Sequence, residues 1–464
     1  MESTVTAVAL CAAGAEKVVS NELRKLDFSV TDGGYGRVRF KTGLAGLYRS
    51  LMGLRAADRV LLEAACFPAG DFDALFEGAR EVPWEAYIPR GMGLTVSKVR
   101  ANRSRLMAET SIQAVVHKAA AGRLCEHLRL ARLPELGKKA DLRVYIEKDQ
   151  VSLLLDLSGA PLFKRGYRTG GGIAPLRETT AAALLLLANW RRKYPLWDPF
   201  CGSGTIAIEA ALYAWDMAPG LGRTFALQDM VIADPALERM IRKELLAKVD
   251  FGRTIRIYGS DVDERAVATA KANLLRAYEL ARGKAVSPDR DHYREYGEGG
   301  TGRLLPDDPG LPDMRTTAFE NAGDGWPRTK TRPLHNGPPY NQGAEKRRGP
   351  ANSTGGQTDR RDRNVAGRQG SHEERRHRNV EKRADEPEGF IVTNPPYGIR
   401  LGDTDAAEAL YRRMADLGQH FSGWKLAVIT DHPGFESHFK RKADSCKEIT
   451  NGAIRSYIYQ YEGL

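Results

Sequence analysis

Two spacings of apolar residues alternate along the first part of the chain. Strand-like runs in "VTAVALC" (residues 5–11) and "GRVRFKT" (36–42) alternate with "AEKVVSNELRKL" (15–26) and "GLAGLYRSLMGL" (43–54), where apolar residues recur at helical spacing. Another strand-like run, "RVLLEAACF", follows. We therefore expect residues 1–65 to form a small α+β unit.

The alternation continues over residues 66–165 with longer elements. A strand is expected in "MGLTVSKVR", and a long helix from about Ser111 to Glu126. In "ADLRVYIEKDQVSLLLDLSG", polar and apolar residues alternate on both sides of Lys148-Asp149-Gln150, which predicts a β-hairpin. This segment is therefore a second unit of strands and helices.

After Leu176 the order of elements becomes regular. The helical "LRETTAAALLLLANW" precedes a strand, Gly turn and helix in "PLWDPFCGSGTIAIEAALYA", and "TIRIYGSDVDERAVATAKANLLRA" repeats the order of strand, acid and helix. The order resumes with "GFIVTNPPYG", "AEALYRRMADLGQHF" and "WKLAVITD". Such alternation predicts an α/β fold with a mostly parallel, doubly wound sheet, assembled from residues 166–283 and 388–464.

A segment of different composition, residues 284–387, separates these two parts. It contains "TKTRPLHNGPPYNQGAEKRRGPANSTGGQTDRRDRNVAGRQGSHEERRHRN", which is poor in aliphatic residues and rich in Gly, Pro, Arg and Asn. It offers too little apolar area to offset the chain entropy lost on folding. We expect a disordered basic insertion that either holds RNA non-specifically or has no function.

Length and composition indicate a multidomain globular protein. With 464 residues, 42% hydrophobic and 28% charged, two or three domains are expected, and the net charge of +11 favours a polyanionic partner. No run approaches the ~20 apolar residues of a membrane span, and no signal peptide is recognisable, so we expect a cytoplasmic protein. The five cysteines lack metal-ligand spacing, so we expect reduced thiols and no metal.

The first candidate site is "WDPFCGSGTIAIE" (197–209). Gly202 and Gly204 lie between a strand and a helix, where glycines let backbone N–H groups approach a ligand. A dinucleotide is disfavoured, because Asp198 would repel a pyrophosphate and the next acid, Asp261, follows much later than the roughly 20 residues of that pattern. A ligand with an ammonium group and a ribose but no phosphate fits, and S-adenosylmethionine meets that description.

The second candidate site is "IVTNPPYGIR" (391–400), where a buried strand ends in a stiff turn. The proline-held carbonyls have no ladder partner and are free to face a ligand. The Asn394 side-chain oxygen and the Pro395 carbonyl could accept both hydrogens of a nucleobase amine and favour a pyramidal nitrogen. Tyr397 would stack on the extruded base. This chemistry requires no general base.

These motifs resemble a known family when taken together. Residues 195–280 and 388–464 look like a class I methyltransferase, and "NPPY" is similar to its amine-methylating motif. The order "DPFCGSGTIAIEAAL", "GSDVDERAVATAKANL", "NPPYG" resembles the bacterial THUMP-domain class I S-adenosylmethionine-dependent RNA guanine-N2-methyltransferases of the YpsC/RlmL type. The resemblance implies a ferredoxin-like part over residues 1–65 and a THUMP RNA-binding domain over 66–165.

The resemblance also implies roles for individual residues. Family members have a strand and an acid between Asn273 and NPPY, which "MRTTAFENAGDGW" (314–326) could supply. The implied cofactor-binding residues are Asp198, Gly202, Gly204, Asp261, Val262 and Asp324. The implied amine site is Asn394, Pro395, Pro396 and Tyr397.

Simpler structural roles are available to most of these residues. Asp198 could cap the following helix, and Asp261 and Asp263 are both competent N-caps, of which Asp263 is assigned to the helix start. The glycines could form only a tight turn, and the proline pair could only end a strand with Tyr397 in the core. Cys201 is expected to fill space rather than act as a nucleophile.

Two basic runs are candidates for RNA contact, although either could be a solvated face. Those in "SKVRANRSRL" and "FKRGYRTGG" are Lys98, Arg100, Arg103, Arg105, Lys164, Arg165 and Arg168, with Tyr167 as a stacking residue. The resemblance favours 23S rRNA as substrate. The alternatives are tRNA, DNA adenine, and an RNA-binding assembly factor without turnover.

Overall fold

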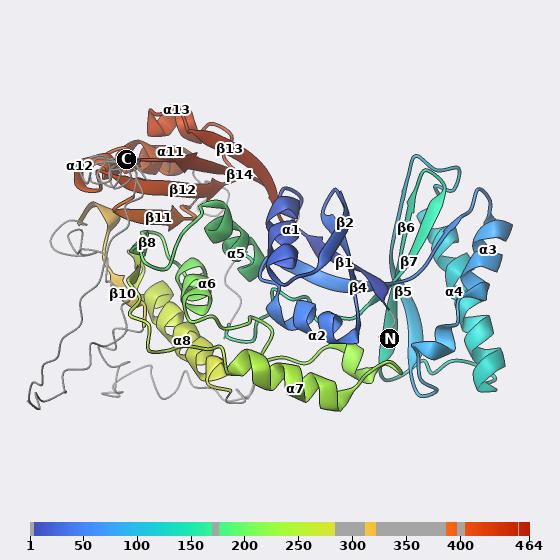
Figure 1. The fold of residues 1–464 in the computed structure, drawn as a ribbon. Coiled ribbons are helices and arrows are strands. Elements are labelled where there is room, and N and C mark those ends of the chain that lie inside the picture. The colour runs from blue at the N-terminus through green and yellow to red at the C-terminus, as the bar shows by residue number, and fades with distance from the viewer. Residues whose placement is uncertain (1–3, 169–175, 284–310, 322–386, 397–403, 453) are drawn as a thin grey trace, which may run out of the picture.

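The computed structural model describes residues 4–168, 176–283, 311–321, 387–396, 404–452 and 454–464. Two seven-stranded sheets organise these residues (Figure 1). We call them the N-terminal sheet and the C-terminal sheet. No helix in these ranges combines the length and apolar character needed to cross a bilayer.

The N-terminal sheet has the strand order β2-β3-β1-β4-β7-β6-β5. Its strands are β1 (Val5–Cys11), β2 (Ser29–Gly34), β3 (Arg37–Thr42), β4 (Ala57–Pro68), β5 (Gly93–Asn102), β6 (Lys139–Glu147) and β7 (Gln150–Asp156). Its helices are α1 (Glu16–Lys25), α2 (Leu44–Gly53), α3 (Phe72–Glu81) and α4 (Glu109–Leu128), with the 3-10 turn η1 (Trp84–Ala86). The predicted hairpin is confirmed, because β6 and β7 pair antiparallel across Lys148 and Asp149, both at positive φ.

One long strand, β4, joins the two units expected from the sequence. Its first half pairs with β1 over Ala57–Leu62, and its second half pairs with β7 over Leu61–Pro68. The two units therefore share a single continuous sheet.

The C-terminal sheet has the order β10-β9-β8-β11-β12-β14-β13. Its strands are β8 (Leu196–Asp198), β9 (Ile257–Asp261), β10 (Asp313–Thr316), β11 (Gly389–Thr393), β12 (Trp424–Thr430), β13 (Ser445–Asn451) and β14 (Ile454–Tyr461). Strands β10, β9, β8, β11 and β12 run parallel to one another in this order. Strand β14 pairs antiparallel with the other side of β12. This sheet confirms the predicted α/β class.

Strand β10 corrects the prediction for part of the insertion. It lies inside the segment expected to be disordered, yet it pairs in parallel register with Tyr258–Asp261 of β9. Met314 on this strand is buried and packs against Gly204 and Gly259. A Cβ atom added to either glycine would lie 3.3 Å from the Met314 side chain. A few apolar residues thus suffice for an edge strand when a preformed neighbour supplies the hydrogen bonds. The "MRTT" prediction for this strand is confirmed, whereas Asp324 lies outside the described residues.

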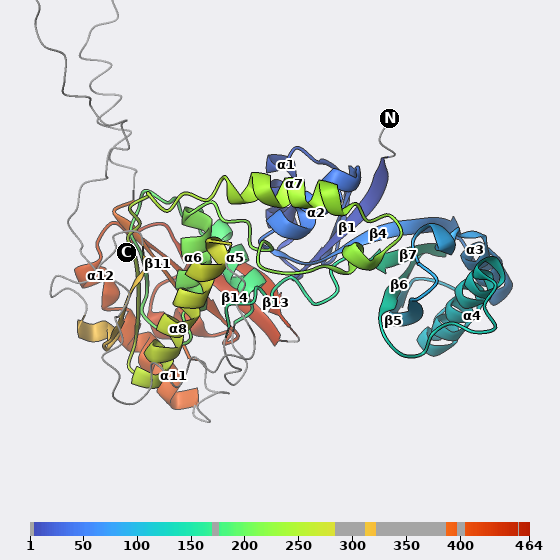
Figure 2. The same cartoon turned by 90° about the horizontal axis from the view of Figure 1, so that it is seen from below.

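Helices cover both faces of the C-terminal sheet. The helices of this part of the chain are α5 (Glu178–Leu187), α6 (Thr205–Ala214), α7 (Pro235–Leu246), α8 (Glu264–Ala281), α11 (Thr404–Met414), α12 (Leu417–His420) and α13 (Phe435–Phe439), with 3-10 turns η2 (Ala226–Asp229) and η3 (Phe319–Asn321). Of these, α7 lies against α2 and not on the C-terminal sheet. Helices α5, α6 and α8 lie on one side of this sheet and α11 on the other (Figures 1 and 2). Alternate strand residues enter two separate apolar clusters, as Leu196 and Trp197 illustrate.

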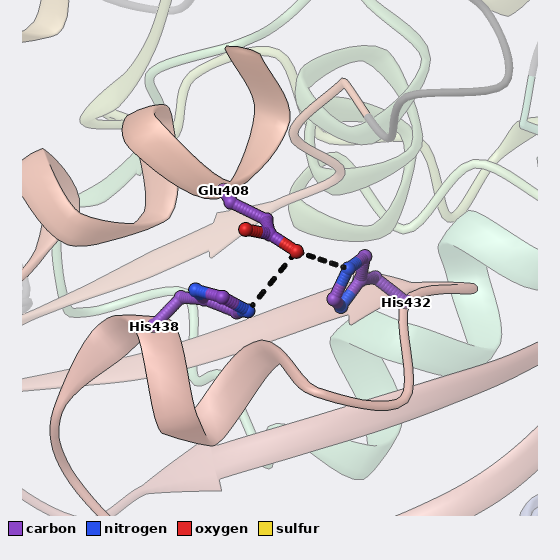
Figure 3. Close-up of side chains that lie close together, drawn as sticks. All are labelled: Glu408, His432 and His438. Atoms are coloured by element: carbon purple, nitrogen blue, oxygen red, sulfur yellow. Dashed lines mark ion pairs between the residues drawn. The ribbon is translucent and has the colours of Figure 1, made fainter. Parts of the chain in front are cut away.

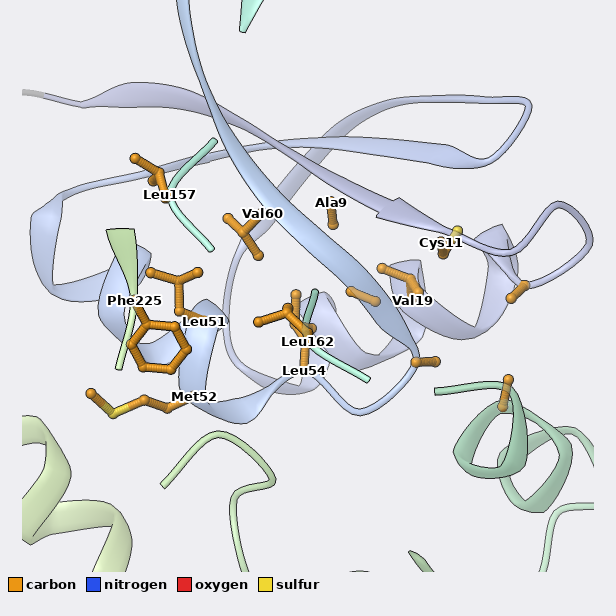
Figure 4. Packing of buried hydrophobic residues seen from close by; sticks show 14 of the residues in the cluster. Ala9, Cys11, Val19, Leu51, Met52, Leu54, Val60, Leu157, Leu162 and Phe225 are labelled. Atoms are coloured by element: carbon orange, nitrogen blue, oxygen red, sulfur yellow. The ribbon is translucent and has the colours of Figure 1, made fainter. Parts of the chain in front are cut away.

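The core of the N-terminal sheet continues into the chain that follows it. Val60 and Leu51 pack in one cluster with Leu157, Leu162 and Phe225 (Figure 4). Helix α7 lies along α2 (Figures 1 and 2), and an Arg49–Glu244 ion pair of 2.9 Å links the two. The two sheets are therefore connected by buried apolar contacts as well as by the chain.

Candidate active site

The two motifs singled out in the sequence meet at one edge of the C-terminal sheet. Strand β8 lies between β9 and β11 and is parallel to both. The carboxyl ends of parallel strands lie at the same edge, which is where open α/β sheets bind ligands. The glycine bend (residues 198–205) after β8 is therefore adjacent to the elbow (residues 394–396) after β11.

The two glycines of the bend serve different purposes. Gly204 has a φ of +81°, and a Cβ there would lie 2.9 Å from the Cβ of Ala270, so a side chain has no room. Gly202 has a φ of +50°, yet a Cβ there would meet no heavy atom within 4 Å. Gly204 is thus required for packing against α8, whereas Gly202 leaves open space where a ligand can approach.

Asp198 is buried at the end of β8, with 1% exposure. Its Oδ1 accepts a 2.6 Å hydrogen bond from the Thr393 hydroxyl and a 3.2 Å bond from the Phe200 N–H. Burial raises the pKa of Asp198 to about 7, although both hydrogen bonds oppose the shift. Its side chain does not cap α6, whose N-cap residue is Gly204. The capping alternative is therefore wrong.

Asp261 joins the bend to the end of β9. Its Oδ2 accepts a 2.9 Å hydrogen bond from the Gly202 N–H, and its Oδ1 accepts a 3.0 Å bond from the Asp263 N–H. Asp263 caps α8 by accepting from the Arg265 N–H, as predicted. Val262, between the two acids, is 74% exposed and available to a ligand.

The buried amide of Asn273, which the sequence motifs do not single out, supports the glycine bend. Nδ2 of Asn273, on α8, donates a 3.0 Å hydrogen bond to the Ser203 carbonyl. Asn273 has no exposed surface. The signal was a polar residue within the apolar spacing of "AKANLL", where a buried amide needs a fixed partner.

The elbow begins where the fully buried β11 ends. Pro395 is buried, and Asn394 and Pro396 are half-buried. The Pro396 carbonyl accepts a 3.2 Å hydrogen bond from the hydroxyl of Tyr411, a buried residue of α11. The expectation that the proline-held carbonyls face a ligand is thus wrong for Pro396. Tyr397 lies outside the described residues.

Next to Tyr411 lie one carboxylate, that of Glu408, and two imidazoles, those of His432 and His438 (Figure 3). Oε1 of Glu408 is 3.6 Å from Nε2 of His432 and 3.3 Å from Nε2 of His438. The Nδ1 atoms accept hydrogen bonds from the Gly434 N–H and from Arg412. With Nδ1 accepting, a neutral ring carries its proton on Nε2, the atom that faces Glu408 in both histidines. A metal at Nε2 would need the opposite tautomer, so this cluster braces α11 against β12 and α13.

The first basic run lies on and after the edge strand β5. Arg100, Arg103 and Arg105 are exposed and Lys98 is half-buried. Two of these arginines form ion pairs, Arg100 with Glu109 at 3.1 Å and Arg105 with Asp149 at 3.0 Å. These pairs lie at the surface, where the ions remain open to other partners.

The second basic run corrects one prediction. Arg165 is 3% exposed, and its guanidinium contacts Glu209, which also accepts a 3.2 Å hydrogen bond from the buried Tyr167 hydroxyl. Neither side chain can reach RNA in this structure, because both are held inside the junction between the sheets. Lys164 is exposed, and Arg168 is half-buried with its Nε 3.2 Å from Glu178.

The cysteines are all free thiols in the structure. Cys201 lies within the glycine bend, and burial raises its pKa well above the ordinary value. A thiol that stays protonated is a poor nucleophile. This agrees with the expectation that Cys201 fills space.

The donor set of the bend fits the cofactor predicted from the sequence. Asp198 offers a buried carboxylate for an ammonium group, and Asp261 offers carboxylate oxygens for hydroxyls. The open side of Gly202 admits a ligand between them. None of these side chains would favour a phosphate.

Comparison with known proteins agrees with this geometry. A family model described as the RMKL-like methyltransferase domain matches residues 165–289 and 360–460. A second family model, described as the RlmL ferredoxin-like domain, matches residues 6–61.

Individual relatives extend over nearly the whole chain. The putative RNA methyltransferase YpsC of Bacillus subtilis (strain 168) is 30% identical over 462 residues, which cover 98% of this chain and 95% of YpsC. The ribosomal RNA large subunit methyltransferase K/L of Syntrophotalea carbinolica is 29% identical over 482 residues, and the match spans 54% of that protein. This chain thus covers about half the length of the K/L relatives.

A solved structure matches equally well. SMU.472, described as a putative methyltransferase complexed with SAH, has a TM-score of 0.73 and 29% identity, with 100% of this chain and 99% of that chain covered. The sheet order, the two motifs at one edge and these matches lead to one conclusion. The chain belongs to the RlmL/YpsC family of class I methyltransferases, whose fold includes the ferredoxin-like N-terminal part.

Proposed function

We propose that this protein methylates the exocyclic N2 amine of a guanine in RNA, with 23S rRNA as the substrate. The observation that carries the proposal is the adjacency of the elbow and the glycine bend, joined by the Thr393–Asp198 hydrogen bond. The names of the YpsC and K/L relatives support RNA, and those of the K/L proteins support large-subunit rRNA.

The bend holds the methyl donor, S-adenosylmethionine, which supplies an electrophilic methyl group on a positively charged sulfur. Asp198 holds the ammonium group, and its burial strengthens that attraction because little water competes. Asp261 accepts from the ribose hydroxyls, and the exposed Val262 covers the adenine. Gly202 provides the space for close approach.

The elbow positions the amine that receives the methyl group. The Asn394 side-chain oxygen and the Pro395 carbonyl accept the two N–H hydrogens, which turns the nitrogen lone pair toward the bend. An amine conjugated with a base ring is a weak nucleophile, so orientation and electrostatics supply most of the rate. Tyr411 holds the elbow through the Pro396 carbonyl.

The N-terminal sheet binds the RNA on which the target base lies. We assign residues 66–165 to a THUMP domain and its exposed Arg100, Arg103 and Arg105, with Lys98 and Lys164, to phosphate contacts. Arg168 lies near the bend, where its Nη2 donates a 2.9 Å hydrogen bond to Thr205, and it positions the bend in preference to RNA.

The test is methyl transfer to undermodified rRNA. The full chain is incubated with labelled S-adenosylmethionine and 23S rRNA from cells that lack this gene, and nucleosides are separated by mass spectrometry. N2-methylguanosine is expected with the wild type, none with Asn394→Ala, and the wild-type amount with Asn21→Ala, an exposed control. A methylated adenine, a product only on tRNA, or equal product from Asn394→Ala would overturn the proposal.

A further inference from the structure

A cavity of about 400 Å³ lies where the N-terminal sheet meets the linker to the C-terminal sheet. Its size falls within the roughly 300–1,000 Å³ of pockets that bind small ligands. Four arginines line it against one aspartate, together with three aromatic rings. The lining includes Tyr35, Arg37, Arg59, Arg143, Tyr145 and Arg177.

The cavity opens on the face of the N-terminal sheet that its helices leave uncovered. Helices α1–α4 bury their apolar residues in the large cluster on one face, with strand residues such as Ala9 and Val60. The opposite face has only a small cluster, Val8, Leu61 and Leu154, against which Tyr145 packs. An uncovered sheet face with polar and aromatic side chains is available to a partner.

The guanidinium groups of this face are held in place. Arg59 donates to Asp156, and Arg143 approaches the same carboxylate at 3.5 Å. Arg143 also lies 3.5 Å from Asp141. Two arginines therefore share a buried carboxylate, and Arg177 pairs with Asp58 at 3.4 Å. The cavity lining still holds more guanidinium groups than carboxylates.

The aromatic rings provide flat surfaces beside the charges. The Arg37 guanidinium lies 5.7 Å from the centroid of the Tyr145 ring, and that of Arg177 lies 4.7 Å from the Phe163 ring. Tyr35, at the tip of the β2–β3 hairpin, is 84% exposed, the largest value among exposed aromatics of the described residues. Rings alternating with arginines suit bases and phosphates of an unpaired strand.

The cavity lies next to the β13–β14 tip, at the edge of the C-terminal sheet that carries the candidate active site. Strand β14 runs antiparallel to β12, so the β13–β14 tip extends beyond Thr430, where β12 ends. This tip contacts the N-terminal sheet, since the Thr450 N–H donates to the Ala13 carbonyl at 3.0 Å. It also contacts the cavity wall, because the would-be Cβ of Gly452 lies 3.0 Å from Nη2 of Arg177.

We propose that this cavity binds an unpaired nucleotide of the RNA substrate, away from the target base, with its phosphates on Arg37 and Arg177 and its base on Tyr35. The inference rests on the proposed RNA methylation and deepens it. The proposed site requires an RNA substrate with a single-stranded segment near the target base, and not a continuous duplex. Such a segment would fix the register of the RNA before the target base is extruded.

Binding of a fluorescent single-stranded RNA oligonucleotide to the full chain tests the inference. Tyr35→Ala should weaken binding about 5- to 150-fold, as expected for loss of one stacked base. Arg37→Ala should reduce the slope of log K against log salt by about 0.7, the value for one single-strand phosphate. Arg24→Ala changes an exposed arginine of α1, on the covered face, and should change neither quantity.

The outcomes separate the inference from the proposed function. Unchanged oligonucleotide binding and unchanged KM for rRNA in both variants would overturn the inference, even if methyl transfer occurs. Weakened binding with a raised KM and unchanged kcat would support it. Equal weakening toward a duplex of the same length would overturn the preference for unpaired RNA. Absence of methyl transfer with intact, Tyr35-dependent binding would reject the function and keep the site.

Discussion

The Thr393 hydroxyl donates a 2.6 Å hydrogen bond to Oδ1 of Asp198, although 195 positions separate the two residues in the chain. Both are buried, at the ends of the neighbouring strands β11 and β8. The bond joins the residue that precedes the elbow to the acid of the glycine bend. A change at Thr393 should therefore affect both halves of the site.

Thr393→Val keeps the shape of the side chain and removes the hydroxyl. A hydrogen bond to an ionised carboxylate contributes about 1.5–3 kcal/mol, so we expect kcat/KM to fall about 10- to 100-fold. Thr393→Ser retains the donor and should lose much less. Steady-state kinetics on rRNA measures both. Wild-type activity in Thr393→Val would contradict a shared role for this bond.

Cofactor affinity should depend on pH through Asp198. Burial raises its pKa to about 7 from an ordinary 3.8, so the carboxylate that holds an ammonium forms only as the pH rises. Calorimetry should find S-adenosylhomocysteine binding more tightly at pH 8 than at pH 6. In Asp198→Asn the affinity should be low and should change little over this range.

The same shift affects the stability of the ligand-free protein. The pKa of Asp198 is higher in the folded protein, about 7, than in the unfolded chain, about 3.8. The contribution of Asp198 to the free energy of unfolding is therefore fully present below about pH 3.8 and is lost as the pH rises through about 7. Relative to Asp198→Asn, the wild type should lose stability between pH 6 and pH 8 in denaturant titrations. A parallel pH dependence in both proteins would contradict this assignment.

The two glycines of the bend should respond differently to alanine. Gly202→Ala introduces a side chain at positive φ in open space, so a stability loss of about 1–2 kcal/mol is expected, with a large loss of cofactor affinity. Gly204→Ala adds a contact of 2.9 Å with Ala270, and overpacking brings a further ~1–3 kcal/mol. Chemical denaturation and calorimetry distinguish the two. Equal stability losses would contradict the packing role of Gly204.

Arg165 and Lys164 are neighbours in the chain, but we expect Arg165 to matter for stability and Lys164 for RNA binding. Arg165→Ala removes the cationic partner of the buried Glu209, to which only the Tyr167 hydroxyl then donates, and should destabilise the protein by about 3–5 kcal/mol. Lys164→Ala should leave stability unchanged and reduce the salt dependence of RNA binding. If Arg165→Ala unfolded like the wild type, the junction would not depend on this ion pair.

Tyr411 offers a matched pair with Tyr459. Each hydroxyl donates to a proline carbonyl, Tyr411 to Pro396 at 3.2 Å and Tyr459 to Pro433 at 3.1 Å. Both Tyr→Phe variants should lose about 0.5–1.5 kcal/mol of stability, the net contribution of one hydrogen bond, because Pro396 is half-buried and Pro433 is exposed, so water can reach the freed carbonyls. Only Tyr411→Phe should also lower kcat. Equal kcat in the two variants would separate Tyr411 from the elbow.

The elements at the active edge could be predicted because local sequence determines them. A Gly bend between an apolar strand and a helix, and an apolar run ending in "NPPY", each carry their turn chemistry within a few residues. Parallel alternation then brings their carboxyl ends to one edge. Asp263 as a helix cap follows from the same local rules.

Long-range partners could not be predicted in this way. The sequence predicts an RNA contact for Arg165, because the interior position of its partner Glu209 is set by tertiary packing and not by local sequence. The pairing of Thr393 with Asp198 depends on which strands are neighbours. Strand β10 lies in a segment of low apolar content, and only the adjacent β9 makes it a strand. The cavity draws its walls from separate segments, none of which has a motif of its own.

The shared strand β4 limits how this protein can be divided or recombined. The matched ferredoxin-like segment ends at residue 61, in the middle of β4, which spans Ala57–Pro68. A graft ending there would cut one strand in two and expose unpaired backbone edges that invite aggregation. The smallest exchangeable cassette is therefore the entire N-terminal sheet. A change of RNA-binding site, by evolution or by engineering, must therefore replace the N-terminal sheet as a whole.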